Sequence, residues 1–250
     1  MQISNQQLVQ IVDNAVADAY HRGGHHLVCK PGCSQCCIGV FPITQQDAAR
    51  LREGLAALDQ TDPAKTTRIR TRVADSLTRL DPWFPGDRTT GILNEDHEAA
   101  ILFEEFANDE PCPVLDPDHG TCDLYEHRPI LCRTFGPPMR TPGDNGEVNL
   151  ATCELCFIHA TTEEIAACEL DPAIPAQEEA SNEAFNAVHN LHGQTLIAYA
   201  LRSNNLISDN ESCQNQATSP SPSPEPAAAS TPPRSSAPSP PTPVSPKSTS

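Results

Sequence analysis

The chain has 250 residues and a formal net charge of −17 at pH 7, from 16 Lys and Arg against 33 Asp and Glu. A protein that binds duplex nucleic acid needs a basic surface to displace counterions from phosphates, so this balance argues against nucleic acid as a partner. Apolar residues make up 38% of the chain and aromatic residues only 4%, so any core must consist mainly of aliphatic side chains.

The sequence shows no membrane or export signal. Its first residues lack the basic start and the apolar run of a secretory signal, and no stretch of about 18 apolar residues follows. We therefore expect no membrane contact and a cytoplasmic location. In that reducing compartment thiols rarely remain as structural disulfides, so those of the 11 cysteines that are clustered are expected to be metal ligands or redox centres.

Apolar residues at helical spacing predict a first helix over residues 2–22, which Gly23 and Gly24 end. A second helix is expected from Thr44 to about residue 59. Thr44 is a good N-cap, and Asp47 three residues later resembles the second half of a capping box.

Pro63 at a first helical position predicts a third helix that runs to about Leu80. Its four arginines are expected to form a solvated face: Arg68, Arg70, Arg72 and Arg79. A fourth helix fits residues 94–108, with Asn94 as its cap. The residues expected in the core of this helix are Ile101, Leu102, Phe103 and Phe106.

Residues 111–160 combine five cysteines with many Pro and Gly residues, which predicts irregular structure that metal coordination would hold together. Thr161 or Thr162 then caps a short helix through about residue 170. A long helix is expected over residues 175–203, with Gly193 as a weak point.

The composition changes at about residue 209. Residues 217–250 hold 11 of the 25 prolines and show no apolar periodicity, so they cannot repay the entropy of ordering. We predict one mainly α domain over 1–208, in which helices flank an irregular cysteine-rich metal-binding segment at about 25–160. A disordered Ser/Pro-rich tail over 209–250 would follow, where a protein partner could dock.

The strongest chemical signal is the run of cysteines at residues 29–37. Cys29, Cys33 and Cys36 have the spacing C-x-x-x-C-x-x-C, and Cys37 follows at once. Thiolates are the usual ligands of zinc and of iron–sulfur clusters. Because adjacent side chains in an extended loop point apart, the last two cysteines predict either two centres or a tightly wound backbone.

A second set of cysteines lies downstream: Cys112, Cys122, Cys132, Cys153 and Cys156. With the first run it supplies enough thiolates for two four-ligand centres, or for one centre with bystanders. Cys168 and Cys213 are expected to be small buried residues instead. The pair at 153 and 156 could also form a catalytic dithiol, although C-x-x-C alone is a weak signal.

Three motifs in fixed order, at 29–37, 112–115 and 122–135, resemble the YkgJ-type cysteine-cluster family, the zinc- or iron-chelating CxxCxxCC domain. The resemblance covers about residues 25–160 and leaves the flanking helices and the tail outside. It implies about eight ligand cysteines and a zinc or iron site, the latter also as an iron–sulfur cluster, without an established reaction. The cysteines that map directly are Cys29, Cys33, Cys36, Cys37, Cys112, Cys122 and Cys132. The eighth is Cys153 or Cys156.

Other residues of the motifs also fit a thiolate site. Arg128 and Arg133 could compensate its negative charge, or could form ion pairs with this chain's abundant carboxylates. Tyr125 is expected to pack against the site.

Two further functions compete with a metal-binding protein that has no chemistry of its own. One is an enzyme that uses S-adenosylmethionine, related to the flagellin lysine N-methylases or, less well, to radical enzymes, whose repeated strand–helix units are absent from the pattern here. The other is an interaction protein whose metal holds the domain together while the Pro-rich tail recruits a partner.

Overall fold

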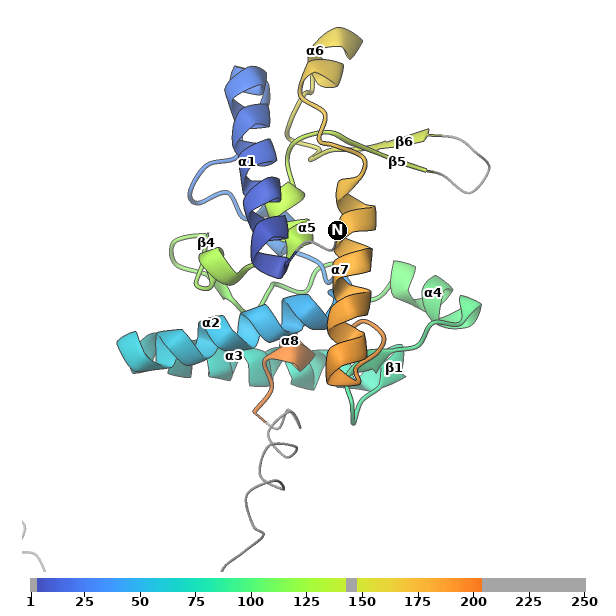
Figure 1. Ribbon diagram of the computed structural model, residues 1–250. Coiled ribbons are helices and arrows are strands. Elements are labelled where there is room, and N and C mark those ends of the chain that lie inside the picture. Colours follow the sequence, from blue (N-terminus) through green and yellow to red (C-terminus); the bar gives the residue numbers. More distant parts are fainter. Residues whose placement is uncertain (1–3, 143–147, 204–250) are drawn as a thin grey trace, which may run out of the picture. The chain divides into compact units, whose positions relative to one another are not determined.

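The computed structural model describes residues 4–142 and 148–203, which all lie in one unit of the chain, Met1–Leu206 (Figure 1). The helices in this part are α1 (Asn5–Gly23), α2 (Gln45–Thr61), α3 (Pro63–Leu80), α4 (His97–Glu104), α5 (Ile130–Thr134), α6 (Thr162–Ala167), α7 (Ile174–His189) and α8 (Ile197–Ala200). The mainly α fold class is confirmed. The predicted tail and Cys213 lie outside the described residues.

The strands form three antiparallel hairpins: β1 (Gly86–Asp87) with β2 (Ile92–Leu93), β3 (Leu115–Asp116) with β4 (Thr121–Cys122), and β5 (Met139–Pro142) with β6 (Val148–Ala151). Two of the three lie in the segment predicted to be irregular. Short 3₁₀ turns, η1 (Gly24–His26), η2 (Gln35–Cys37), η3 (Asp81–Trp83) and η4 (Tyr125–His127), join the elements.

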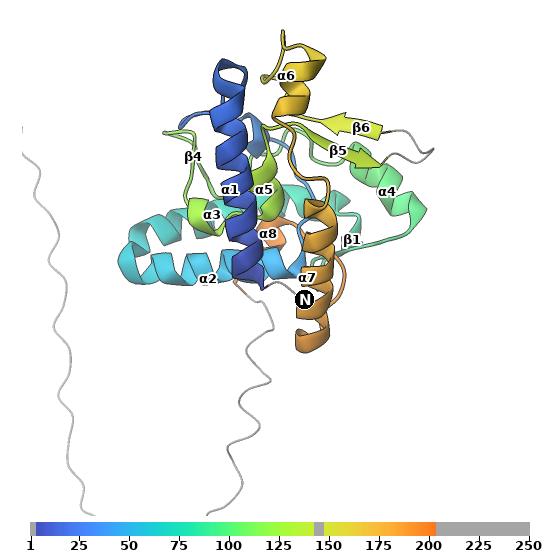
Figure 2. The same cartoon turned by 45° about the horizontal axis from the view of Figure 1, so that its top comes forward.

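Helices α2 and α3 run side by side, and α1 and α7 stand across them (Figures 1 and 2). Thr44 caps α2 by accepting a hydrogen bond from the Asp47 N–H, and Asp62 caps α3 in the same way. The main core lies between α2, α3 and α8 and includes Leu51 and Ile69, both 0% exposed. Their capping residues and apolar spacing explain why these two helices were predictable.

Helix α1 packs on a second apolar cluster. Its N-cap is Ser4, which forms a reciprocal capping box with Gln7. Leu8 and Val12 are fully buried against Ile130 of α5 and residues of the α6–α7 connection. The helix therefore lies directly against the segment that carries the third cysteine motif.

The predicted fourth helix is wrong at both ends. Helix α4 starts at His97 because Asp96, not Asn94, caps it, accepting from the Ala99 N–H. Two expected core residues, Ile101 and Leu102, are more than half exposed. Phe106 is buried as predicted, but it lies beyond the helix.

The predicted helix over 175–203 is broken. Helix α7 ends at Asn190, which takes a left-handed conformation with φ 52°. An extended stretch follows, in which Thr195 pairs with Ile43 through two backbone hydrogen bonds before α8 begins. Gly193, with φ +66°, lies inside this break. Backbone hydrogen bonds to Ile43, just before α2, replace helical hydrogen bonds here. Apolar periodicity along the sequence cannot predict such a long-range pairing.

Helix α6 is shorter than predicted. Thr161 caps it through a capping box with Glu164, and it ends at Cys168, which is buried as expected.

The arginines of α3 do more than form a solvated face. Arg72 donates to the Pro113 carbonyl at 2.9 Å and to the Asp123 carboxylate at 2.5 Å. Arg79 forms a paired contact with Glu110 at 2.8 Å for both bonds. These contacts join α3 to the segment that carries Cys112 and Cys122.

Among residues 4–142 and 148–203, no helix is long and apolar enough to span a membrane.

Candidate metal centre

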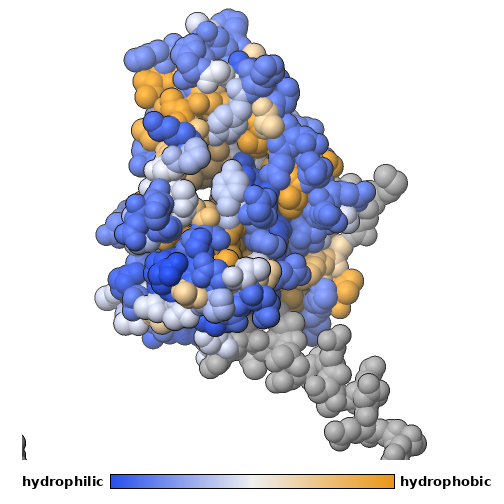
Figure 3. Space-filling model, turned by 90° about the vertical axis from the view of Figure 1, so that its left-hand side faces the viewer, coloured by the Kyte–Doolittle hydropathy of each residue, from blue (hydrophilic) through white to orange (hydrophobic). Residues whose placement is uncertain are grey.

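A cavity of about 730 Å³ opens between α1, the loop after it, the β3–β4 hairpin and α5. Seven candidate cysteines line it: Cys29, Cys33, Cys36, Cys37, Cys112, Cys122 and Cys132. On the side of the molecule that carries β4 and the loop after α1, the surface is hollowed, with apolar side chains inside the hollow (Figure 3). We call this space the thiol cavity.

The first cysteine run reaches the cavity through two tight turns. The Cys33 N–H donates to the Lys30 carbonyl, and η2 winds the chain at Cys36 and Cys37. Both adjacent cysteines line the cavity, because the backbone here is tightly wound, as one of the two predicted alternatives for this pair requires. Gly120 of the β3–β4 connection, with φ +65°, lets this turn approach closely, because a Cβ there would lie 2.8 Å from the Gly32 carbonyl oxygen.

The second motif is fixed to the first by backbone hydrogen bonds. The Cys112 N–H donates to the Cys37 carbonyl at 2.8 Å. Cys122 then pairs with Leu115 in the β3–β4 register. Residues far apart in the sequence thus meet at one wall of the cavity.

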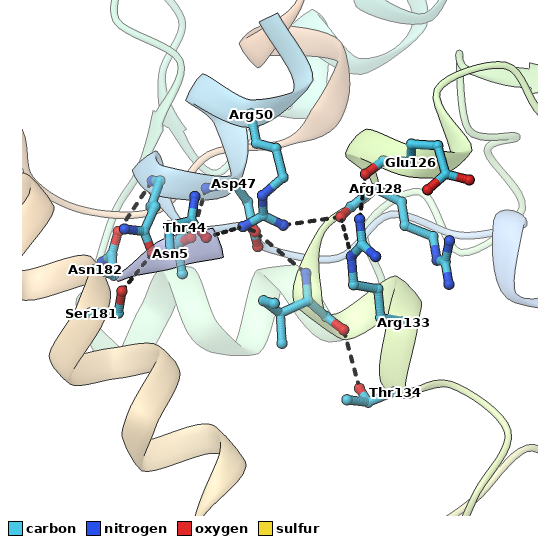
Figure 4. Close-up of polar contacts among 12 residues, drawn as sticks. Asn5, Thr44, Asp47, Arg50, Glu126, Arg128, Arg133, Thr134, Ser181 and Asn182 are labelled. Carbon is cyan, nitrogen blue, oxygen red and sulfur yellow. Dashed lines mark hydrogen bonds and ion pairs between the residues drawn. The ribbon is translucent and has the colours of Figure 1, made fainter. Parts of the chain in front are cut away.

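Cys132 lies on α5, whose position depends on a buried polar network (Figure 4). Asp47 of α2 accepts from the Ile130 N–H at 3.3 Å and from Arg50 at 2.6 Å. Arg50 also donates to the Arg128 carbonyl at 3.0 Å. An otherwise costly buried carboxylate is thereby paired and used to fix the start of α5.

Backbone N–H groups are directed at several of the sulfurs. Those of Val114 and Leu115 face the sulfur of Cys112, and that of Leu124 faces the sulfur of Cys122; both sets lower the pKa of the thiol they face. Such donors favour a thiolate, the form that binds metal. In each case the N–H donors belong to residues two or three positions after the cysteine.

Burial opposes ionisation of the same thiols. It raises the pKa of Cys112 to about 12, and it raises the pKa values of Cys122 and Cys132 as well. The pKa of Cys36 is raised first by a hydrogen bond with Cys37 and then by burial. Without a cation these thiols hold their protons, so a metal ion would have to displace them.

Two other candidates, Cys153 and Cys156, do not line the thiol cavity. They are 5% and 4% exposed in an apolar cluster with Leu27, Phe157 and Cys168. Cys29 packs against this cluster, and its sulfur lies 4.0 Å from that of Cys156.

The two arginines of the third motif have different environments. Arg133 is buried and donates twice to Asp13 of α1, at 2.8 and 2.7 Å, which is the ion-pair reading. The Arg128 side chain is directed away from Arg50 (Figure 4) and stacks 3.7 Å above the Tyr125 ring. It also lies 4.0 Å from Asp13, and it lowers the pKa values of two thiols, at Cys36 and Cys122, so its charge acts on the sulfurs as well as in an ion pair.

The contribution of α1 to the cavity was not predicted. Asp13, Val16 and Tyr20 line the cavity from one face of this helix. The Tyr20 hydroxyl donates to the Cys29 sulfur, and burial together with this bond raises the pKa of Tyr20. The spacing of three and four residues was a usable signal, because such positions share a helix face.

Across residues 4–142 and 148–203, no three His, Cys, Asp or Glu side chains stand close enough to hold one ion as they are placed. The donor chemistry nevertheless fits a thiophilic metal, because several thiols share one cavity with backbone N–H donors and a nearby guanidinium. Binding would therefore need side-chain rotation at the cysteines.

Comparison with known families agrees with this chemistry. The sequence model of the CxxCxxCC family, described as "Putative zinc- or iron-chelating domain", matches residues 28–189. No curated protein and no solved structure gives a significant match. The match reaches past the expected limit near residue 160 and takes in α7, so that helix does not lie outside the family's domain. With this match over more than half of its length, the chain belongs to the CxxCxxCC family.

Proposed function

We propose that this chain binds zinc or iron, the latter as single ions or as an iron–sulfur cluster, through the thiolates of its clustered cysteines. The observation that carries the proposal is the meeting of seven cysteines from three separated motifs at one cavity. Zinc and iron–sulfur clusters both favour thiolate ligands. The cavity, at about 730 Å³, has room for either.

The chain's own residues would prepare the site. Backbone N–H groups after Cys112 and Cys122 stabilise the thiolate form, and Arg128 compensates the charge that accumulates when several thiols ionise. A bound metal would cross-link the three cysteine motifs that line the cavity. The proposal places the chain in a reducing compartment such as the cytoplasm, where the thiols stay free to bind.

The test is elemental analysis of anaerobically purified full-length chain, together with its visible absorption spectrum. We expect stoichiometric metal: a colourless protein with zinc, or a coloured one with iron. The double substitution Cys112→Ala/Cys132→Ala should lower the metal content, whereas Cys168→Ala, buried outside the thiol cavity, should leave it unchanged. Chain that is folded and metal-free even after incubation with either metal would refute the proposal.

A further inference from the structure

The candidate cysteines fall into two groups in space, and the division does not follow the sequence. Group one is Cys36, Cys112, Cys122 and Cys132, whose thiols act on one another electrostatically across the thiol cavity. Group two is Cys29, Cys153 and Cys156, which meet at the edge of that cavity. Cys29 begins the first run in the sequence but contacts the last pair.

Group two is assembled by contacts that are independent of group one. The Cys156 N–H donates to the Cys153 carbonyl at 2.9 Å, which closes the C-x-x-C pair into a turn. The next residue, Phe157, donates its N–H to the His26 carbonyl at 3.0 Å. These bonds bring the turn against the chain just ahead of Cys29.

Two further contacts aim polar groups at the sulfurs of group two. The Val28 N–H faces the sulfur of Cys156, and the Tyr20 hydroxyl faces that of Cys29. Gly136, with φ +114°, leaves room for both: a Cβ there would lie 3.3 Å from the Cys29 sulfur and 3.4 Å from the Tyr20 hydroxyl oxygen. Hydrogen-bond donors that converge on sulfur are the usual surroundings of metal-bound thiolates.

The geometry points to a second metal centre in this chain, held by Cys29, Cys153 and Cys156 and separate from the centre of group one. The inference rests on the proposed function and deepens it, because it replaces one shared site with two. Cys33 follows Cys29 by four residues in the same turn and lines the cavity beside it. Cys33 would complete a four-thiolate set, which is the preferred arrangement in structural zinc sites.

A redox pair is the competing use of these thiols, since two of the sulfurs lie 4.0 Å apart. Reactive cysteines are partly exposed thiolates in electropositive surroundings. Cys156 of that pair, like its neighbour Cys153, is instead almost fully buried among apolar side chains. This environment fits ligands of a thiophilic cation better than a nucleophile.

The experiment uses full-length wild-type chain loaded with ¹¹³Cd²⁺, a soft ion that binds thiolates as zinc does. We expect two ¹¹³Cd resonances at saturation and two cadmium ions per chain. Scalar couplings should connect one resonance to the Hβ protons of Cys29, Cys153 and Cys156, and the other to those of group one. Because couplings identify ligands in the wild-type chain, the result does not depend on any variant folding.

Variants then separate the centres. Cys153→Ala/Cys156→Ala should lose one resonance and half of the cadmium, while Cys168→Ala from the same apolar cluster should keep both. A single resonance coupled only to group one, or a second resonance without coupling to Cys153 and Cys156, overturns the second centre and leaves the proposed function standing. A folded chain that binds no cadmium overturns the proposed function itself.

Discussion

Two regions of this molecule are held together in different ways. The helical frame of α2, α3 and α8 encloses a continuous aliphatic core. The cysteine-rich segment, residues 111–160, has no helix longer than the five residues of α5 in its described parts, 111–142 and 148–160. Val114 and Leu124 of this segment reach that core, and the segment also contains arginine–aspartate pairs and thiols that line a cavity. We therefore expect metal removal to loosen the segment more than the frame.

Removal of metal should separate the two regions most clearly. At a free metal concentration about 1,000 times the dissociation constant, binding adds about 4 kcal/mol of stability. Chelation should remove that contribution. Hydrogen exchange should then show faster exchange at 29–37 and 111–134, with α2 and α3 protected as before. Equal loss of protection in α2 and α3 would contradict the division into two regions.

Ile69→Ala should weaken the frame instead. Ile69 is 0% exposed in the core between α2 and α3, so the loss of its side chain should cost about 3 kcal/mol of unfolding free energy. Urea denaturation measures this change. Val188→Ala, at a residue that is 80% exposed, is the control and should change stability by less than about 0.5 kcal/mol. The Ile69→Ala protein that remains folded should keep its full metal content. A lower metal content would show that the packing of the helical frame also determines the geometry of the site.

Glu178 offers a pH test of the joint between α2 and α7. Burial, and next the neighbouring Asp47, raise the pKa of Glu178 from 4.5 to about 7. The folded state therefore favours the protonated acid, so this group stabilises the fold at low pH and its contribution disappears as pH rises from about 4.5 to 7.

Glu178→Gln should remove this pH dependence and raise stability at pH 8 by on the order of 2 kcal/mol. The measurement is the unfolding free energy in urea at several pH values, with the exposed neighbour Glu179→Gln as control. If the unfolding free energy changes with pH equally in wild type and in Glu178→Gln, the Glu178 carboxyl does not cause the pH dependence.

Arg128→Gln should have the smallest effect and should act on the segment alone. Removing the guanidinium that faces the thiols of Cys36 and Cys122 should weaken metal binding about tenfold. Competition with a chromophoric chelator measures the affinity. Arg128→Lys should restore part of it, and Arg22→Gln, whose side chain pairs with Asp18 on the outer part of α1, should leave it unchanged. An unaltered metal affinity in Arg128→Gln would show that Arg128 has only a structural role.

The frame was predictable because its signals are local. Thr44 and Pro63 mark helix starts through the chemistry of single residues. The prediction of one helix over 175–203 was wrong because the chain pairs with Ile43 at Thr195. These two residues lie about 150 positions apart in the sequence, so no local signal indicates the break. The start at Asn94 failed because Asp96 offered an equally good cap two residues later.

The site was predictable in its members but not in its arrangement. The residue type and spacing singled out the cysteines, and the seven that mapped to the family motifs line one cavity. Nothing in the spacing indicates that Cys29 lies beside Cys156. Tyr20 and Asp13 were missed because a helix ahead of the motif gives no chemical sign of the surface that it covers.

The contacts of Arg72 join the two regions that the predictions treat apart. One guanidinium binds the Pro113 carbonyl and the Asp123 carboxylate, each next to a candidate ligand, while its backbone belongs to α3. The coupling free energy between ion binding and the stability of α3 is reciprocal. If an ion at Cys112 and Cys122 stabilises α3, then destabilising α3 lowers the affinity for the ion by the same factor. Because we expect α3 to stay protected when metal is removed, the same reciprocity predicts that a partner that binds α3 leaves the bound metal in place, although Arg72 connects the two regions.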